Sequence, residues 1–419
     1  MKAAGVDTRS PAEAGTLRWF ITAWITVSTL LNYMDRQTLS VVAPLIRNEF
    51  KLTNEDYAHI VSAFLASYTV MYTVGGRFVD WIGERVGMAA SIVWWSIATM
   101  LHSLATGALS LGIYRFILGI GEPANYPAAL RATTSWFAKT ERGLPIAIYS
   151  SGSSVGAIFA PPLIAWITLR YGWRLAFLAP GALGLVWVVV WLHIYHRPEA
   201  PAFERAVAAP LRWTDLLKDR NVQAIFFARL LADPVWYFYM FWTPEYLTRA
   251  RGFSLAEIGL YGWIPFVAAG LGGVFGGAAS DWLIRAGVAP ATARRRVLYG
   301  AAAIAPLGIA TGWIRSTSLA MLLISVAAFV CFVWFINTSA LISDVFPEQV
   351  VGSVQGLVGT AGSGGGMLFS LLTGFLLDRS SYAIVFAIAG SMHVLASLIL
   401  WGMKRDRSSL RPAGAEGVA

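Results

Sequence analysis

Long apolar stretches recur along the whole chain, and they limit its fold more than any other feature. A helix needs about 20 apolar residues to cross the roughly 30 Å hydrocarbon core of a bilayer. Such stretches form helices because a helix satisfies its own backbone hydrogen bonds where no water is present. With 57% apolar and 13% charged residues among 419, the chain has too little polar surface to cover a soluble globule. We therefore expect an all-α membrane protein.

Twelve stretches are expected to span the membrane. They are 17–40, 57–80, 88–107, 109–131, 143–168, 173–195, 221–247, 257–283, 297–315, 318–343, 352–377 and 382–403. An even number of spans places both termini on one side. Of the 32 lysines and arginines, 20 lie in tails and loops on that side, eight on the opposite side and four within spans. Since short loops rich in Lys and Arg stay in the cytoplasm, both termini are expected to be cytoplasmic.

The charge and cysteine content favour a membrane setting over other partners. The net charge of +9 is expected to face anionic lipid headgroups rather than nucleic acid. Cys331 is the only cysteine and the five histidines are scattered, so neither a disulfide framework nor a metal site is expected. The first span carries charges and leads into further spans, unlike a cleavable signal peptide. We expect a multi-pass monomer in a bacterial inner membrane.

Two halves are expected around the longest polar connection of the chain. The predicted divisions are a tail 1–16, a six-helix bundle 17–195, a linker 196–220, a second six-helix bundle 221–403 and a tail 404–419. A repeat supports them, since Gly76-Arg-Phe-Val-Asp80-Trp81 matches Gly277-Ala-Ala-Ser-Asp281-Trp282 at an offset of 201 residues. Pseudo-repeated halves with a binding site between them at the midplane are typical of secondary transporters.

Ionisable residues lie inside two of the expected spans, Asp35 and Arg36 in the first and Arg115 and Glu122 in the fourth. Charges at membrane depth cost several kcal/mol unless they are paired or hydrated, so they mark substrate or proton pathways. Arg115 and Glu122 are seven residues apart and lie within about 20° of one helix face. Asn125 extends this polar stripe by one turn. Asp35 and Arg36 point about 100° apart, so each needs another partner.

Several motifs resemble known families. Gly76-x-x-x-Asp80-x-x-Gly83-x-Arg85 resembles the loop signature of the major facilitator superfamily, which implies twelve helices in two halves. Asn32-Tyr33-Met34-Asp35-Arg36 and Tyr114-Arg115-Phe-x-x-Gly119-x-Gly121-Glu122-x-x-Asn125-x-Pro127-Ala128 resemble the anion:cation symporter family. That family includes hexuronate, galactonate, glucarate and aromatic-acid permeases and the animal sialic acid and vesicular glutamate carriers. The resemblance implies a proton-coupled symporter with the proton as its only coupling ion and no further cofactor.

The charged residues are predicted to have different roles in a site that binds both substrate and protons. Arg36 is predicted to bind the substrate carboxylate, because its planar guanidinium matches a carboxylate and stays charged. Asp35 and Glu122 are predicted to carry protons, with Arg115 biasing the protonation of Glu122. A permanent structural ion pair between Arg115 and Glu122 is the alternative.

The remaining predicted contacts form three sets. In the amino half, polar and aromatic substrate contacts are predicted at Tyr33, Tyr68, Tyr72 and Asn125. In the carboxyl half they are predicted at Trp236, Tyr237, Asn337, Thr360 and Ser363. The resemblance assigns a cytoplasmic gate to Gly76, Asp80, Arg85 and Asp281. The carboxyl half is expected to contribute no comparable charge at midspan, and Arg229 and Asp233, four residues apart, are predicted to form a structural pair.

Three function classes are consistent with these patterns. The first is a proton-coupled symporter that takes up an organic carboxylate anion, with a sugar acid favoured over an aromatic acid or a short monocarboxylate. The second is a drug/proton antiporter, whose pocket would not need two arginines inside the membrane. The third is a membrane enzyme or sensor, which neither a catalytic triad nor a set of metal ligands in the sequence supports.

Overall fold

Every regular element in the computed structural model is a helix, within the residues that it describes, 11–137, 141–196 and 213–403. The prediction of an all-α membrane protein is therefore confirmed. The helices are α1 (Pro11–Phe50), α2 (Asn54–Ile82), α3 (Glu84–Leu101), η1 (His102–Leu104), α4 (Ala108–Gly121), η2 (Glu122–Ala124), α5 (Asn125–Trp136), α6 (Gly143–Tyr171), α7 (Trp173–Ile194), α8 (Trp213–Lys218), α9 (Arg220–Arg251), α10 (Leu255–Tyr261), α11 (Ile264–Arg285), α12 (Pro290–Ile304), η3 (Ala305–Gly312), α13 (Thr317–Val345), α14 (Glu348–Arg379) and α15 (Tyr382–Trp401).

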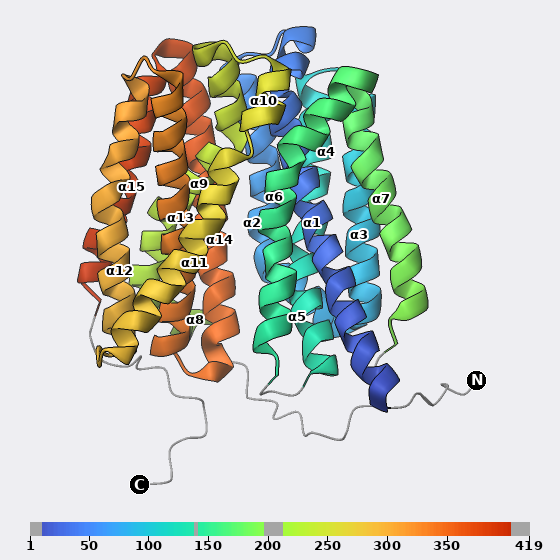
Figure 1. Ribbon diagram of the computed structural model, residues 1–419, viewed down its shortest axis with the longest axis vertical. Coiled ribbons are helices and arrows are strands. Elements are labelled where there is room, and N and C mark those ends of the chain that lie inside the picture. Colours follow the sequence, from blue (N-terminus) through green and yellow to red (C-terminus); the bar gives the residue numbers. More distant parts are fainter. Residues whose placement is uncertain (1–10, 138–140, 197–212, 404–419) are drawn as a thin grey trace.

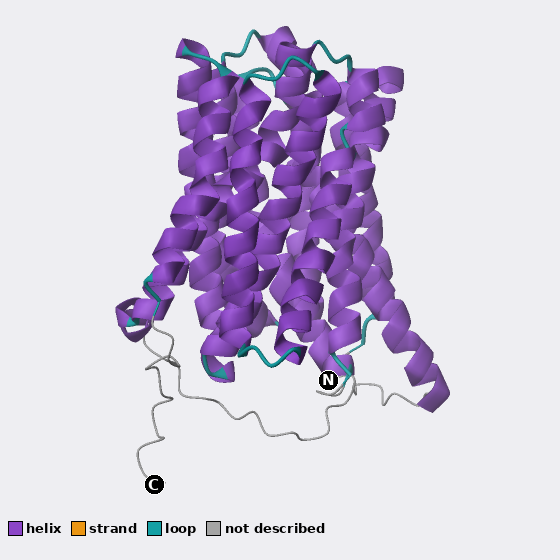
Figure 2. Cartoon of the chain, turned by 60° about the vertical axis from the view of Figure 1, so that its left-hand side comes forward, coloured by secondary structure: helices purple, strands orange, loops and turns teal. Residues whose placement is uncertain are grey.

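The helices form two groups that stand side by side. Figure 1 shows α1 to α7 in blue and green on one side and α9 to α15 in yellow to red on the other. Across the boundary α2 packs against α14, α1 against α9, and α6 against α10 and α11. In the turned view of Figure 2 the helices run the full height of the molecule and most loops lie at the two ends. We call the end at which α1 begins the lower end, as in Figure 1.

Nine helical segments of the described chain are long and apolar enough to cross a membrane. The other three expected spans, 17–40, 109–131 and 297–315, fall on α1, on α4 with η2 and α5, and on α12 with η3. The count of twelve spans stays a prediction, as do the boundaries of the two halves. Much of the predicted linker 196–220 and of the tails 1–16 and 404–419 lies outside the described residues.

A proline interrupts the expected fourth span. Pro123 has no N–H to donate, so the helical hydrogen bond that this position would make is missing. As a result α4 ends at Gly121, a 3₁₀ turn follows at Glu122–Ala124, and α5 begins at Asn125. Glu122 therefore lies in a short 3₁₀ turn between two α-helices, with its own backbone still in the right-handed helical region.

Polar contacts between the two groups begin at the upper end and continue along α2 as far as Thr73. Arg47 of α1 forms a buried ion pair with Glu245 of α9 at 2.5 Å. At the start of α2, Asn54 Nδ2 donates to Asp378 Oδ1 of α14 at 2.6 Å. The lowest of these contacts joins the hydroxyls of Thr73 and Thr360 at 3.0 Å. Among the described residues, hydrogen bonds and ion pairs join the two groups from the upper end down to the level of Thr73, and none joins them below it.

Candidate functional site

The centre of the candidate site is a buried ion pair between Arg36 of α1 and Glu122 of η2. Arg36 Nη2 lies 2.6 Å from Glu122 Oε2, and Nε donates to the same oxygen at 3.0 Å. The side chains are only 5% and 0% exposed. The other carboxylate oxygen, Oε1, has no hydrogen-bond partner. Burial of two charges carries a large desolvation cost, and Glu122 uses only part of its capacity to offset it.

Aromatic rings surround the Arg36 guanidinium. Its central carbon lies 4.9 Å from the ring centre of Tyr33, 5.4 Å from that of Phe64 and 4.7 Å from that of Tyr68. A cation over an aromatic face is stabilised by about 0.5–2 kcal/mol, more when it is desolvated. The next ring, Tyr72, meets Tyr68 edge to face at 5.6 Å. Arg36 therefore faces the protein interior and not lipid.

Arg115 contacts the backbone of Arg36 and does not pair with Glu122. Its Nη2 donates to the backbone carbonyl of Arg36 at 3.1 Å, while Nε and Nη1 have no hydrogen-bond partner. The alternative of a direct Arg115–Glu122 ion pair is not what the structure contains, because Glu122 pairs with Arg36 instead. Sequence spacing did not identify the partner of Glu122, since that partner comes from another helix.

Asp35 points away from its neighbour Arg36. It is 1% exposed, and neither carboxylate oxygen has a hydrogen bond of normal geometry. The polar groups that face it are Trp95 and Thr99 of α3. The backbone thus directs one of two adjacent charges toward Glu122 and the other into the interior of the amino half.

Asn125 lies one turn beyond Glu122, at the start of α5. Its Oδ1 accepts a hydrogen bond from Ser28 Oγ of α1 at 3.2 Å, and both side chains are buried. Asn125 therefore joins α5 to α1 on the side of the amino half that carries Arg36.

Three predicted contacts of the carboxyl half lie at the boundary with the amino half. Tyr237 of α9 lies within electrostatic reach of Arg36 and Tyr68. Ser363 Oγ accepts a hydrogen bond from Thr69 Oγ1 at 3.0 Å, and the Thr360 hydroxyl bonds to that of Thr73. The hydroxyls of Thr360 and Ser363 on α14 therefore form hydrogen bonds between the two groups of helices.

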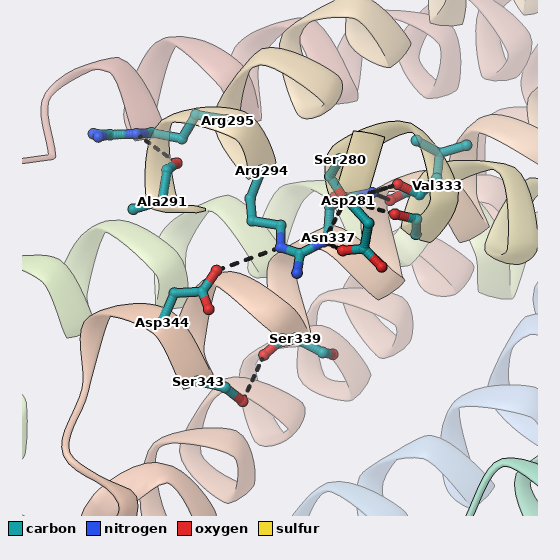
Figure 3. Close-up of polar contacts among 12 residues, drawn as sticks. Ser280, Asp281, Ala291, Arg294, Arg295, Val333, Asn337, Ser339, Ser343 and Asp344 are labelled. Atoms are coloured by element: carbon teal, nitrogen blue, oxygen red, sulfur yellow. Dashed lines mark hydrogen bonds and ion pairs between the residues drawn. The ribbon is translucent and has the colours of Figure 1, made fainter. Parts of the chain in front are cut away.

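The other two predicted contacts of this half pack inside it. Trp236 meets Phe266 and Phe332 edge to face at 5.8 and 4.7 Å. Asn337 donates to the carbonyls of Gly276 and Val333 at 3.0 and 2.9 Å. Figure 3 shows Asn337 next to Ser280 and Asp281. Asn337 joins α13 to α11 in this structure and is not near Arg36.

The predicted gate residues lie toward the lower end, and their described contacts stay within their own halves. Arg85 donates to the carbonyl of Leu192 at 2.6 Å. Asp281 accepts from Arg294 at 2.7 Å, and Arg294 also reaches Asp344 at 3.3 Å (Figure 3). A side chain added at Gly76 would meet open space. The side chain of Asp80 lies outside the described residues. Their role as a gate stays a prediction.

The expectation of no comparable charge in the carboxyl half is wrong. Arg229 Nε lies 2.6 Å from Asp233 Oδ2, and the two side chains are 5% and 16% exposed. The predicted pairing itself is confirmed, because residues four apart face each other on a helix. Their burial was missed, since the sequence does not tell which face of α9 lies inside.

Comparison with known proteins shows the family to which this chain belongs. The profile of the Major Facilitator Superfamily matches residues 25–369 and 293–418. The chain belongs to this superfamily. The hexuronate transporter of Escherichia coli K12 is 29% identical over 416 residues, covering 95% of this chain and 96% of that protein. The D-galactonate transporter of E. coli O6:H1 is 27% identical, covering 92% and 95%.

One solved structure has the same fold as this chain. It is the crystal structure of a bacterial homologue of the human lysosomal transporter Spinster, in an inward-facing and unoccupied conformation. It is 18% identical, has a TM-score of 0.72 and covers 92% of this chain and 95% of that one. The fold, the superfamily and the relatives together identify the chain as a membrane transporter and not an enzyme.

Proposed function

We propose that this transporter takes up an organic carboxylate anion together with protons. The favoured substrate is a sugar acid such as a hexuronate, galactonate or glucarate. The names of the similar transporters support the substrate class. The observation that carries the proposal is the buried Arg36–Glu122 ion pair, because it is a guanidinium held at membrane depth by a group that can accept a proton.

In this proposal the substrate carboxylate competes with Glu122 for Arg36. While Glu122 is ionised it occupies the guanidinium with two hydrogen bonds. When a proton binds to its carboxylate the charge attraction is lost, and Arg36 becomes available to the substrate. Arginine keeps its charge throughout, so the proton on Glu122 and the substrate on Arg36 are loaded together.

Asp35 is proposed as a second proton carrier. It is buried in the amino half, its oxygens have no hydrogen-bond partner, and Glu122 and Arg115 act on it electrostatically. An intramembrane carboxylate without a partner is a functional candidate by default. Arg115, bonded to the Arg36 backbone, adds a fixed positive charge beside both acids.

The distribution of contacts supports alternating access. The upper end is fastened by Arg47–Glu245 and the Asp378 contacts, while described polar contacts across the halves stop at Thr73. This distribution supports a proposal in which the halves separate at the lower end. We propose that the lower end, where α1 begins and α15 ends (Figure 1), faces the cytoplasm of a bacterial inner membrane, because the loops there are rich in Lys and Arg.

Flux into liposomes tests the proposal. The purified transporter is reconstituted and given radiolabelled glucuronate, galactonate, glucarate, phthalate or lactate, with and without an acidic exterior. Uptake of a sugar acid above its equilibrium level, stimulated by the proton gradient and abolished by a protonophore, is expected. Gradient-independent uptake, or uptake of none of these acids, would contradict the proposal.

A further inference from the structure

The second buried ion pair, Arg229–Asp233, has features of a binding site that its structural role does not explain. Arg229 uses only Nε toward Asp233, and its Nη1 is buried without a hydrogen-bond partner. The guanidinium carbon lies 4.7 Å from the ring centre of Phe335, which holds its plane in place. A pair needed only for packing would be expected to satisfy its buried donors.

A row of tyrosines connects this pair with Arg36. Tyr68 lies under the Arg36 guanidinium and meets Tyr72 edge to face. Tyr72 is in turn within electrostatic reach of Arg229 and Asp233. Tyr237 has both Arg36 and Asp233 among its electrostatic neighbours. The two ion pairs therefore face one region at the boundary of the halves, one from each side.

Glycines of α14 allow these side chains to pack directly against the helix backbone. A Cβ atom at Gly359 would overlap Tyr72, one at Gly362 would overlap Asp233 Oδ2, and one at Gly366 would overlap the ring of Tyr237. The same helix carries open glycine positions, such as Gly356, where a Cβ would meet nothing within 4 Å. The glycines of α14 thus include those that face Asp233 and two of the tyrosines that lie between the pairs.

We propose that the Arg229–Asp233 pair binds the hydroxyl-bearing end of a sugar acid with one carboxylate, and disfavours sugar acids with two. This inference rests on the proposed function, in which Arg36 binds the first carboxylate. Asp233 can accept hydrogen bonds from neighbouring hydroxyls, and the free Nη1 of Arg229 can donate to a hydroxyl or ring oxygen. Because Asp233 already neutralises Arg229 and itself repels anions, a second carboxylate finds no net positive charge there.

Glucuronate and glucarate provide the test, because they differ in whether the far end carries a second carboxylate. Proton-driven uptake of both radiolabelled acids is measured in liposomes for the wild type, Asp233→Asn and the double variant Arg229→Gln/Asp233→Asn. The wild type is expected to favour glucuronate. In Asp233→Asn the freed Arg229 charge is expected to move the glucarate-to-glucuronate ratio upward by at least about tenfold, since one charge interaction at close range changes sign.

The double variant separates recognition from misfolding. It leaves no unpaired charge, so it is expected to lose the preference for glucuronate without gaining glucarate. Asp56→Asn is the matched control, because it removes the same charge from the exposed capping box of α2 at the upper end. It is expected to keep the wild-type ratio. If Asp233→Asn cannot be isolated folded, the ratio in the double variant decides.

Two outcomes would overturn the inference and leave the proposed function standing. One is a wild type that takes up glucarate as well as glucuronate. The other is an unchanged ratio in the folded variants. By contrast, a wild type without proton-driven uptake of any sugar acid contradicts the proposed function itself.

Discussion

Each half contains a buried ion pair, Arg36–Glu122 in one and Arg229–Asp233 in the other, and these two pairs differ in how they are held. Arg36 and Glu122 are 86 residues apart and join α1 to η2. Arg229 and Asp233 are four residues apart within the single helix α9. A pair between two segments separates when the segments move or when the acid is protonated. A pair within one helical turn stays together in any rigid motion of that helix. The amino half is therefore suited to coupling and the carboxyl half to fixed recognition.

A proline lies beside each pair, with different results. Pro123 follows Glu122 and breaks the helix into α4, η2 and α5. Pro234 follows Asp233, yet α9 continues from Arg220 to Arg251. Since Pro234 donates no hydrogen bond, the carbonyl of Leu230 is left exposed to α14, where a Cβ at Gly365 would overlap it. A proline thus accompanies a 3₁₀ turn at one pair and close helix packing at the other.

The largest expected effect comes from removing the guanidinium of the pair between segments. Arg36→Ala is expected to abolish sugar-acid binding and uptake, by more than about 100-fold, because a charge-assisted bidentate contact is lost and buried Glu122 is left unpaired. Binding is measured by calorimetry and uptake in liposomes. Arg36→Lys, which keeps charge but not the planar fork, is expected to retain a small part of the activity. Normal uptake by Arg36→Ala would show that Arg36 does not bind substrate.

Neutralising the acid of the same pair is expected to separate exchange from accumulation. Glu122→Gln should still exchange internal for external substrate, because Arg36 remains, but should not accumulate it against a gradient, because the proton site is gone. Counterflow and gradient-driven uptake are compared in the same vesicles. In the comparison variant Asp233→Asn, gradient dependence should persist for whichever acid is carried. Uphill accumulation by Glu122→Gln would assign coupling elsewhere.

A smaller effect is expected from crowding the pair within α9. Gly362→Ala places a methyl group against Asp233 Oδ2, and overpacking of this kind costs about 1–3 kcal/mol. We expect a lower melting temperature and roughly tenfold weaker uptake. Gly356→Ala is the control, since the added methyl meets open space and removes a flexible glycine. Equal behaviour of the two variants would mean that α14 does not pack on Asp233 as described.

The smallest effect is expected from a substitution at Tyr72, which lies between the two ion pairs. Tyr72→Phe removes one hydroxyl and keeps the ring contact with Tyr68. The loss of one hydrogen bond to substrate corresponds to about 0.5–1.5 kcal/mol, or a few-fold in KM. Initial uptake rates over a range of glucuronate concentrations measure this change. The proton dependence should be unaffected, and a loss of coupling in Tyr72→Phe would place this tyrosine in the proton pathway instead.

The sequence by itself determined the class of the protein and the spacing within each helix. Apolar spans predicted an all-helical membrane protein, the motifs around Asp80 and Arg36 indicated the superfamily, and the four-residue spacing of Arg229 and Asp233 predicted their pairing. These features follow from composition and from the fixed 100° turn per residue, so they need no knowledge of other helices.

Only the tertiary structure decided which segments meet. It paired Glu122 with Arg36 rather than with Arg115, and it turned Asn337 toward α11 instead of the centre. It also placed Asp233 against Gly362 of α14, inside the protein. The physical reason is that the rotation of a helix about its axis and the choice of its neighbours depend on packing with distant parts of the chain, which local periodicity does not specify.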